Sequence, residues 1–176
     1  MNMDPSKIPF NTLIVGPTNS GKSRFVVDQL YGPFHFKFDY IVLICPTFAH
    51  NKTYHRIGEN DPRMSVITCM QHQVEMWLKI VRFAFEGTNT LIILDDCTSS
   101  KDVKSRTGEL VHLALSARHI GISVWVLTQK MTGITGDRYV GRTWRRSFSF
   151  TPHRPRQRKR FLMITLANSL RMNTKV

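Results

Sequence analysis

The chain has 176 residues, of which 41% are hydrophobic, so its composition excludes wholesale disorder and is typical of one globular domain. Residues 1–136 hold 14 Lys and Arg against 11 Asp and Glu, a net charge of +3. Residues 137–176 hold 11 basic residues and one acidic residue, a net charge of +10. This asymmetry predicts either a polyanionic partner for the C-terminal end or a solvated basic tail.

The N-terminal segment and the cysteines predict an intracellular protein. The first ten residues, "MNMDPSKIPF", lack the apolar centre of a signal peptide, and the longest apolar runs have the length of strands, so no membrane partner is expected. Cys45, Cys69 and Cys97 show no C-x-x-C spacing. We interpret them as buried thiols in a reducing compartment rather than as a disulfide framework.

Short apolar runs alternate with segments of helical period along residues 1–136. In chain order, strands are expected at 11–16, 40–47, 65–68, 90–96 and 122–129, and helices at 22–32, 71–87 and 105–121. Uninterrupted apolar strands separated by helices predict an α/β fold, in which a mainly parallel sheet is covered by helices on both faces.

The first expected strand runs into a complete phosphate-binding motif. Residues 16–23, "GPTNSGKS", match G-x-x-x-x-G-K-[ST] between an apolar strand and a helix. The glycines let the backbone curl so that successive N–H groups face phosphate oxygens, and the helix N-terminus adds its positive dipole end. Lys22 is expected to reach the β- and γ-phosphates, and the Ser23 hydroxyl to ligate Mg²⁺. The predicted nucleotide-binding residues are Gly16, Pro17, Thr18, Asn19, Ser20, Gly21, Lys22 and Ser23.

Two later strands end in polar side chains that could complete this site. The run "LIILDDC" (91–97) places Asp95 and Asp96 at the carboxyl edge of the sheet, where ligands of α/β proteins bind. Because a strand alternates its faces, we assign Asp95 to the metal and Asp96 to orienting or deprotonating the attacking water. The run "VWVLTQ" (124–129) would bring Gln129 to the same edge, where its amide could contact the γ-phosphate and that water.

Arg118 lies just before the last of these strands and has two interpretations. It could act as an arginine finger on the nucleotide of a neighbouring subunit. It could equally be a helix C-terminal arginine that the helix dipole favours.

Three runs in this order, "GPTNSGKS", "LIILDD" and "ARHIGISVWVLTQ", resemble the FtsK-HerA superfamily of DNA-pumping ATPases. More narrowly, they are similar to the genome-packaging ATPases of poxviruses, other large DNA viruses and Polinton-type elements. The resemblance covers roughly residues 8–136, and the third run is its more specific part.

The resemblance implies a RecA-like P-loop core in which a third strand separates the two Walker strands. It implies ATP and Mg²⁺ as cofactors, a homo-oligomeric ring, double-stranded DNA as substrate, and a capsid or portal partner. It also implies a location in the virion or in the host nucleus or cytoplasm. On this chain, Lys22 and Ser23 would hold nucleotide and metal, Asp95 and Asp96 would serve metal and water, and Gln129 would be the sensor. Arg118 would be a trans-acting residue.

These observations favour an ATP-hydrolysing DNA translocase and leave two alternatives open. One is a small phosphotransferase of the nucleoside kinase type, which would need an Arg-rich lid and a nucleoside pocket. The other is a truncated, non-catalytic remnant that binds ATP and nucleic acid without turnover.

The basic stretch "RTWRRSFSFTPHRPRQRKRF" (142–161) stands where the resemblance implies a further apolar strand, so the C-terminal part of the fold is expected to be incomplete. We divide the chain into a P-loop core, 1–136, and a basic tail, 137–176, that is disordered or frame-shifted. Codons for Trp144, Phe148 and Phe150 begin with T, so a frame offset by one base would encode apolar residues there. An early stop codon in that offset frame would contradict the frame-shift hypothesis. A true basic arm would instead bind phosphate backbones with a strong salt dependence.

Overall fold

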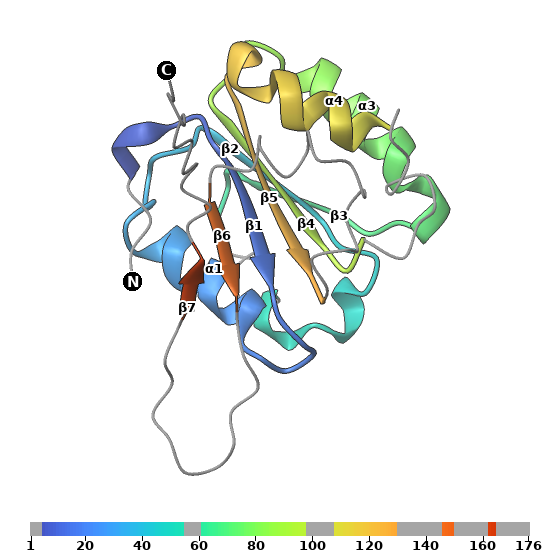
Figure 1. The fold of residues 1–176 in the computed structure, drawn as a ribbon. Helices are drawn as coiled ribbons and strands as arrows, with labels where there is room; N and C mark the ends of the chain where they lie inside the picture. The colour runs from blue at the N-terminus through green and yellow to red at the C-terminus, as the bar shows by residue number, and fades with distance from the viewer. Residues whose placement is uncertain (1–4, 55–60, 98–107, 130–145, 150–161, 165–176) are drawn as a thin grey trace, which may run out of the picture.

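One sheet organises the protein (Figure 1). The computed structural model describes residues 5–54, 61–97, 108–129, 146–149 and 162–164. Their strands lie in the order β3-β2-β4-β5-β1-β6-β7. All neighbours pair in parallel except β6 and β7, which are antiparallel. The strands are β1 (Asn11–Val15), β2 (Tyr40–Ile44), β3 (Met64–Ile67), β4 (Thr90–Asp95), β5 (Ile122–Thr128), β6 (Arg146–Ser149) and β7 (Leu162–Ile164).

Helices cover both faces of this sheet. Helix α1 (Lys22–Tyr31) packs on one face, and α3 (Val74–Phe85) and α4 (Glu109–Ser116) pack on the other (Figure 1). Short 3₁₀ turns occur at η1 (Pro5–Lys7), η2 (Phe48–His50), η3 (Gln71–Gln73) and η4 (Ala117–Ile120). Within the described ranges, no helix is long and apolar enough to cross a bilayer.

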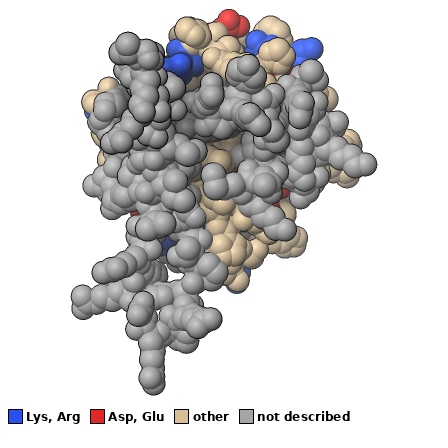
Figure 2. All heavy atoms as spheres, viewed as in Figure 1, with Lys and Arg blue, Asp and Glu red and all other residues tan. Residues whose placement is uncertain are grey.

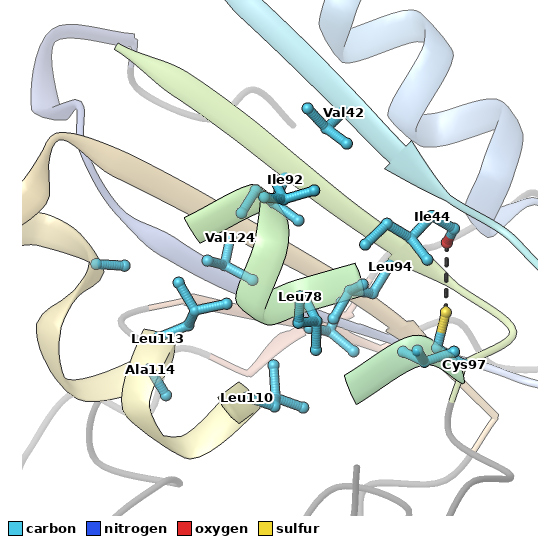
Figure 3. Packing of buried hydrophobic residues seen from close by; sticks show 14 of the residues in the cluster. Val42, Ile44, Leu78, Ile92, Leu94, Cys97, Leu110, Leu113, Ala114 and Val124 are labelled. Carbon is cyan, nitrogen blue, oxygen red and sulfur yellow. Dashed lines mark hydrogen bonds between the residues drawn. The ribbon is translucent and has the colours of Figure 1, made fainter. Parts of the chain in front are cut away.

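The central strands are apolar on both sides because each of their faces is buried. Ile92, Leu94 and Val124 join the cluster under α3 and α4, together with Leu78 and Leu113 from those helices (Figure 3). The intervening residues of the same strands face α1 on the opposite side of the sheet; they include Leu91, Ile93 and Trp125. This alternation confirms the predicted α/β class, with its mainly parallel sheet between two helical layers.

The strand order also confirms what the resemblance implies. Strand β5 lies between β1, which precedes the phosphate loop, and β4, which ends in Asp95. The expected helix over 105–121 begins at Glu109 in the described part of the chain and passes through η4 to Gly121, whose φ is 80°. Residues 105–107 lie outside the described ranges.

The sheet continues beyond β1 into the basic stretch. Residues 146–149 form β6, which pairs in parallel with β1 from Thr12↔Arg146 to Val15↔Ser149. A strand therefore occupies the position that we expected to be left empty. A ladder is made of backbone hydrogen bonds, which a polar sequence can supply as well as an apolar one. Leu162–Ile164 form β7, which pairs antiparallel with β6. Residues 137–145, 150–161 and 165–176 of the predicted tail lie outside the described residues, so both accounts of the tail stay predictions.

Two glycines form the turns that lead into the central strands β4 and β5. Gly87 has a φ of 81° and donates its N–H to the carbonyl of Ile120 at 2.9 Å. Gly121 has a φ of 80°, and a Cβ at this position would lie 2.7 Å from the carbonyl oxygen of Thr88. At Gly87 a Cβ would meet nothing within 4 Å.

Replacing these two glycines by alanine should therefore cost unequal amounts of stability. Gly87→Ala should lower the free energy of unfolding by about 1 kcal/mol, since it introduces only an unfavourable positive φ. Gly121→Ala should lower it by about 2–4 kcal/mol, because it adds a clash with a backbone carbonyl. Urea unfolding of both purified variants measures the difference. Equal losses would show that the backbone near Thr88 relaxes freely.

Candidate nucleotide-binding site

A cavity of about 670 Å³ opens at the carboxyl edge of the sheet. Its lining comes from residues 18–24, from Thr47 and 50–53 after β2, from Asp95 and Asp96 after β4, and from 127–129 at the end of β5. Parallel strands end together at this edge, which is why side chains far apart in sequence meet there. The structure thus brings most of the predicted site residues into one cavity.

The phosphate loop presents the free end of α1 to this cavity. Gly21 caps the helix with a φ of 93°, a conformation that favours glycine, and no side chain caps the helix. Asn19 also has a positive φ, of 61°. The first N–H groups of a helix have no partner within the helix, so this end is suited to phosphate oxygens.

Lys22 lies folded over the loop. Its Nζ donates hydrogen bonds to the carbonyl oxygens of Gly16 at 2.7 Å and Pro17 at 2.8 Å. Partial burial lowers the pKa of the Lys22 ammonium, while the carboxylates of Asp95 and Asp96 act in the opposite direction. The ammonium is therefore held at the cavity by weak, replaceable acceptors, and a phosphate is a stronger one.

A partly buried hydrogen bond joins the loop to the end of β4. The Ser23 hydroxyl donates to Asp95 Oδ2 at 2.9 Å, and Asp95 is only 6% exposed. Burial raises the pKa of the Asp95 carboxyl, and the Ser23 hydrogen bond and the nearby Lys22 only partly offset this effect. The ionised form of Asp95 is therefore incompletely stabilised by the protein alone.

This pair of oxygen donors fits Mg²⁺. Magnesium prefers hard oxygen ligands and takes one or two protein groups, completing its shell with water and nucleotide phosphates. The Ser23 hydroxyl and the Asp95 carboxylate, whose charge is incompletely stabilised, supply two such oxygen ligands beside the phosphate loop. Among the described residues, no three His, Cys, Asp or Glu side chains gather into an all-protein metal cage. Ser23 and Asp95 would hold the ion.

Asp96 lies just beyond the last residue of β4 and has different surroundings from Asp95. It is exposed, its φ is 59°, and it lines the cavity. Thr47 Oγ1 donates to Asp96 Oδ2 at 3.0 Å, and Gln71 Nε2 donates to the Asp96 carbonyl at 2.6 Å. One carboxylate is thus buried against the loop, and the other is open to solvent.

The segment after β2 contributes site residues that the sequence analysis missed. Besides Thr47, it brings Asn51 Nδ2 to 3.5 Å from the Ser23 hydroxyl. It also places Tyr54, which is 1% exposed, against Ser23 and Asp95. Burial and then the charge of Asp95 hold the pKa of the Tyr54 phenol well above its usual value. The available signal was the polar Thr47 just after an apolar strand, but its use required knowing that β2 lies beside β4.

The remaining predicted residues fall in two places. Gln129 follows β5 directly and lines the cavity, at the edge where we expected it. Arg118 is exposed in η4, before the first residue of β5, and does not line the cavity. Within one chain, the structure does not bring Arg118 to the nucleotide-binding residues.

A phosphate loop, its helix and two carboxylates at the carboxyl edge of a parallel α/β sheet define a P-loop NTPase fold. The sequence matches the family described as Poxvirus A32 protein over residues 4–150, and the chain belongs to that family. This confirms the resemblance to poxvirus packaging ATPases. The match also runs past residue 136, the end of our predicted core, and includes β6.

Solved structures of similar fold include viral packaging enzymes. The genome packaging NTPase B204 from Sulfolobus turreted icosahedral virus 2, in complex with ATP-gammaS, has a TM-score of 0.64 and 19% identity, covering 87% of this chain and 78% of that one. A second structure of B204, described as the DNA-packaging ATPase from Sulfolobus Turreted Icosahedral Virus, has a TM-score of 0.59 and 18% identity, and the match covers 88% of this chain and 79% of that one. The cytoplasmic domain of the Type VII secretion ATPase EccC from Thermomonospora curvata has a TM-score of 0.55 and 13% identity, and the match covers 81% of this chain and 19% of that one. No curated protein matches the chain by sequence.

The raised pKa of Asp95 predicts opposite effects of Asp95→Asn on stability and on metal-dependent nucleotide binding. The amide can still accept the Ser23 hydrogen bond but carries no buried charge, so at pH 7.5 the nucleotide-free variant should melt about 2–4 °C higher. Because the folded-state pKa is raised, the wild type loses stability relative to the variant as pH rises through that pKa. The difference in melting temperature between the variant and the wild type should therefore vanish at a pH below the ordinary pKa of aspartate.

Melting curves at several pH values, with and without Mg²⁺ and an ATP analogue, test this prediction. The analogue with Mg²⁺ should stabilise the wild type more than the variant. Asp28→Asn is the matched control, because Asp28 forms an exposed ion pair with Arg24 whose loss should change little. A variant that melts lower than the wild type at pH 7.5 would contradict the proposed burial cost.

Proposed function

We propose that this protein is an ATP-hydrolysing, DNA-translocating subunit of a viral genome-packaging motor. The observation that carries the proposal is the Ser23–Asp95 hydrogen bond, because it joins the phosphate loop to the acidic strand end within one cavity. Membership of the Poxvirus A32 protein family supports the packaging role.

In this proposal the phosphate loop binds the nucleotide. The N–H groups of the loop and of the first turn of α1 hold phosphate oxygens, and Lys22 turns from the Gly16 and Pro17 carbonyls to the β- and γ-phosphates. Ser23 and Asp95 hold Mg²⁺, which, when bound, neutralises charge on the phosphate oxygens. Lys22 and the loop amides stabilise the charge that develops in the transition state.

The exposed side of the site would position the attacking water. Asp96 and Gln129 come from the ends of β4 and β5, two strands that pair directly. A carboxylate can accept a proton from the water, and an amide can contact both the water and a γ-phosphate oxygen. We assign Asp96 to orienting or deprotonating the water and Gln129 to sensing the γ-phosphate.

Double-stranded DNA is the proposed substrate of the motor, and a ring of subunits with a capsid or portal is its proposed setting. The net charge of +10 over 137–176 would attract phosphate backbones. On the face shown in Figure 2, Lys and Arg atoms of the described residues are visible mainly at the upper end, where Asp or Glu atoms lie among them. The basic C-terminal end suits a protein that works on a polyanion inside an infected cell or a virion.

ATP hydrolysis by the purified chain, with and without double-stranded DNA, tests this function. DNA should raise the rate, and Lys22→Ala should lower it by about a hundredfold or more, since it removes the cation on the γ-phosphate. Lys37→Ala, an exposed lysine before β2 and outside the cavity, is the control and should retain activity.

Other results would point to the two alternatives. Binding of ATP and DNA without turnover would favour a non-catalytic remnant. Phosphate transfer from ATP to nucleosides, with no response to DNA, would favour a phosphotransferase. A rate of ATP hydrolysis that neither DNA nor the Lys22→Ala substitution changes would rule out the motor assignment for this chain.

A trans-acting role for Arg118 predicts complementation between two inactive variants. Arg118→Ala should lower hydrolysis by about a thousandfold, because a neighbour's nucleotide loses its arginine. Lys22→Ala subunits lack a working site but still supply Arg118, so mixing the two variants should recover activity. If Arg118 only favours the helix end, its variant should hydrolyse ATP normally, and mixing should add nothing.

A further inference from the structure

Tyr54 brings an unsatisfied polar group to a position beside the nucleotide-binding cavity. Its side chain is 1% exposed, and within the described ranges its buried phenol oxygen has no hydrogen-bond partner. Buried tyrosine hydroxyls usually find a partner, because an unpaired buried donor lowers the stability of the fold. An unpaired donor beside a binding site therefore points to a role in that site.

A short turn after β2 sets the position of this phenol. The carbonyl of Asn51 accepts the N–H of Tyr54 at 3.1 Å, and Asn51 Oδ1 accepts the N–H of Thr53 at 3.2 Å. Asn51 Nδ2 also reaches the Ser23 hydroxyl at 3.5 Å, which ties the turn to the phosphate loop. The ring of Tyr54 packs in the apolar cluster under α1, and its hydroxyl lies close to Ser23 and Asp95.

The Asp95 carboxylate can use the hydrogen bond that a phenol donates. Its two oxygens can each accept more than one hydrogen bond, and Ser23 donates to Oδ2 at 2.9 Å. Burial raises the pKa of Asp95, and the hydroxyls of Ser23 and Tyr54 both act to lower it. Tyr54 therefore faces the carboxylate as a donor, although the two groups do not meet the geometry of a hydrogen bond.

We propose that Tyr54 is a positioning residue for Asp95, and that its phenol donates the second hydrogen bond to this carboxylate when Ser23 and Asp95 hold Mg²⁺. The Mg²⁺ site belongs to the proposed function, and the inference rests on it. Ser23 gives its one hydroxyl hydrogen to Asp95, so its oxygen lone pairs would face the ion. A donor on the buried side of Asp95 would keep the carboxylate directed toward the ion, as hydrogen bonds generally do for ligating carboxylates.

This role gives the hydroxyl different effects in the free and the metal-bound protein. An unpaired hydroxyl adds no hydrogen bond to the stability of the free protein. One that is paired with a carboxylate contributes more than a hydrogen bond between neutral groups. A tyrosine that served only to pack the core would affect both forms alike, so the two roles can be distinguished.

The first test compares the melting temperatures of the wild type, Tyr54→Phe and Tyr40→Phe without nucleotide or metal. Phenylalanine keeps the ring and removes only the hydroxyl. Tyr40 is 47% exposed at the first residue of β2, so it offers the same substitution at the end of that strand away from the cavity. Tyr54→Phe should melt at the wild-type temperature or higher. A lower melting temperature would show that the hydroxyl already stabilises the free protein, and would overturn the inference.

Calorimetric titration with the ATP analogue AMPPCP provides the second readout. In EDTA, all three proteins should bind the analogue with the same Kd, because the hydroxyl acts only through the metal site. In Mg²⁺, the Kd of Tyr54→Phe should be about tenfold higher than that of the wild type, the effect of losing one hydrogen bond to a charged group. Tyr40→Phe should match the wild type. An unchanged Kd in Mg²⁺, or an equal rise in EDTA and in Mg²⁺, would overturn the inference.

A double variant tests whether Tyr54 acts through Asp95. Asp95→Asn removes the charge that the phenol is proposed to serve. In that background, Tyr54→Phe should change the Kd in Mg²⁺ by less than about twofold, because two residues that act through one interaction are not additive. A further tenfold loss would assign the hydroxyl to another partner and contradict the proposed role.

Binding and hydrolysis together separate failure of this inference from failure of the proposed function. Suppose that Mg²⁺ improves binding to the wild type and that Tyr54→Phe loses this gain, but that the wild type does not hydrolyse ATP. The proposed function is then contradicted, and the inference stands. Hydrolysis that depends on Lys22, with equal gains from Mg²⁺ in both proteins, contradicts the inference alone. A wild type whose binding gains nothing from Mg²⁺ contradicts both, because both rest on the metal site.

Discussion

The hydrogen bond between Ser23 and the buried Asp95 is the constraint on which the rest of the structure depends. These residues are joined across the sheet, because β5 lies between the strand before the loop and the strand that ends in Asp95. The loop must therefore bridge the end of β5, and the N–H of Gly16 anchors it there with a 3.0 Å hydrogen bond to the Thr128 carbonyl. Burial raises the pKa of the Asp95 carboxyl, so keeping this group ionised lowers the stability of the fold. The same incompletely stabilised charge favours binding of a cation.

Packing below this edge makes such an arrangement rigid. Trp125 is fully buried in β5 and contacts the rings of Phe10, Phe34 and Phe38 with centroids 5.2–6.3 Å apart. Aromatic groups at these distances pack well and fix the strand against the layer of α1. The strand ends are consequently held by a dense core, while the side chains just beyond them, such as Asp96 and Gln129, lie outside this core and line the cavity.

Much of this site could be predicted from local sequence, and the remainder depends on contacts between distant segments. Apolar runs identified the five strands β1 to β5, and the phosphate motif located Lys22 and Ser23, because both signals lie within a few consecutive residues. Thr47 meets Asp96 across 49 positions of sequence, and no local pattern states that β2 lies beside β4. Strand β6 was missed for another reason: its ladder depends on a free edge of β1, which its own polar sequence does not reveal.

The position of Arg118 constrains how subunits could cooperate. The cavity lies at the carboxyl edge of the sheet, whereas Arg118 precedes β5 and so lies toward the opposite edge. Two subunits related by a twofold axis would bring identical surfaces together, so equivalent edges would meet. For Arg118 to reach a neighbour's nucleotide, the opposite edge of one subunit must face the cavity of the next. That is a head-to-tail contact, and head-to-tail contacts close into rings when the rotation between subunits permits. A trans-acting Arg118 at this edge and a ring-shaped motor therefore both require a head-to-tail interface.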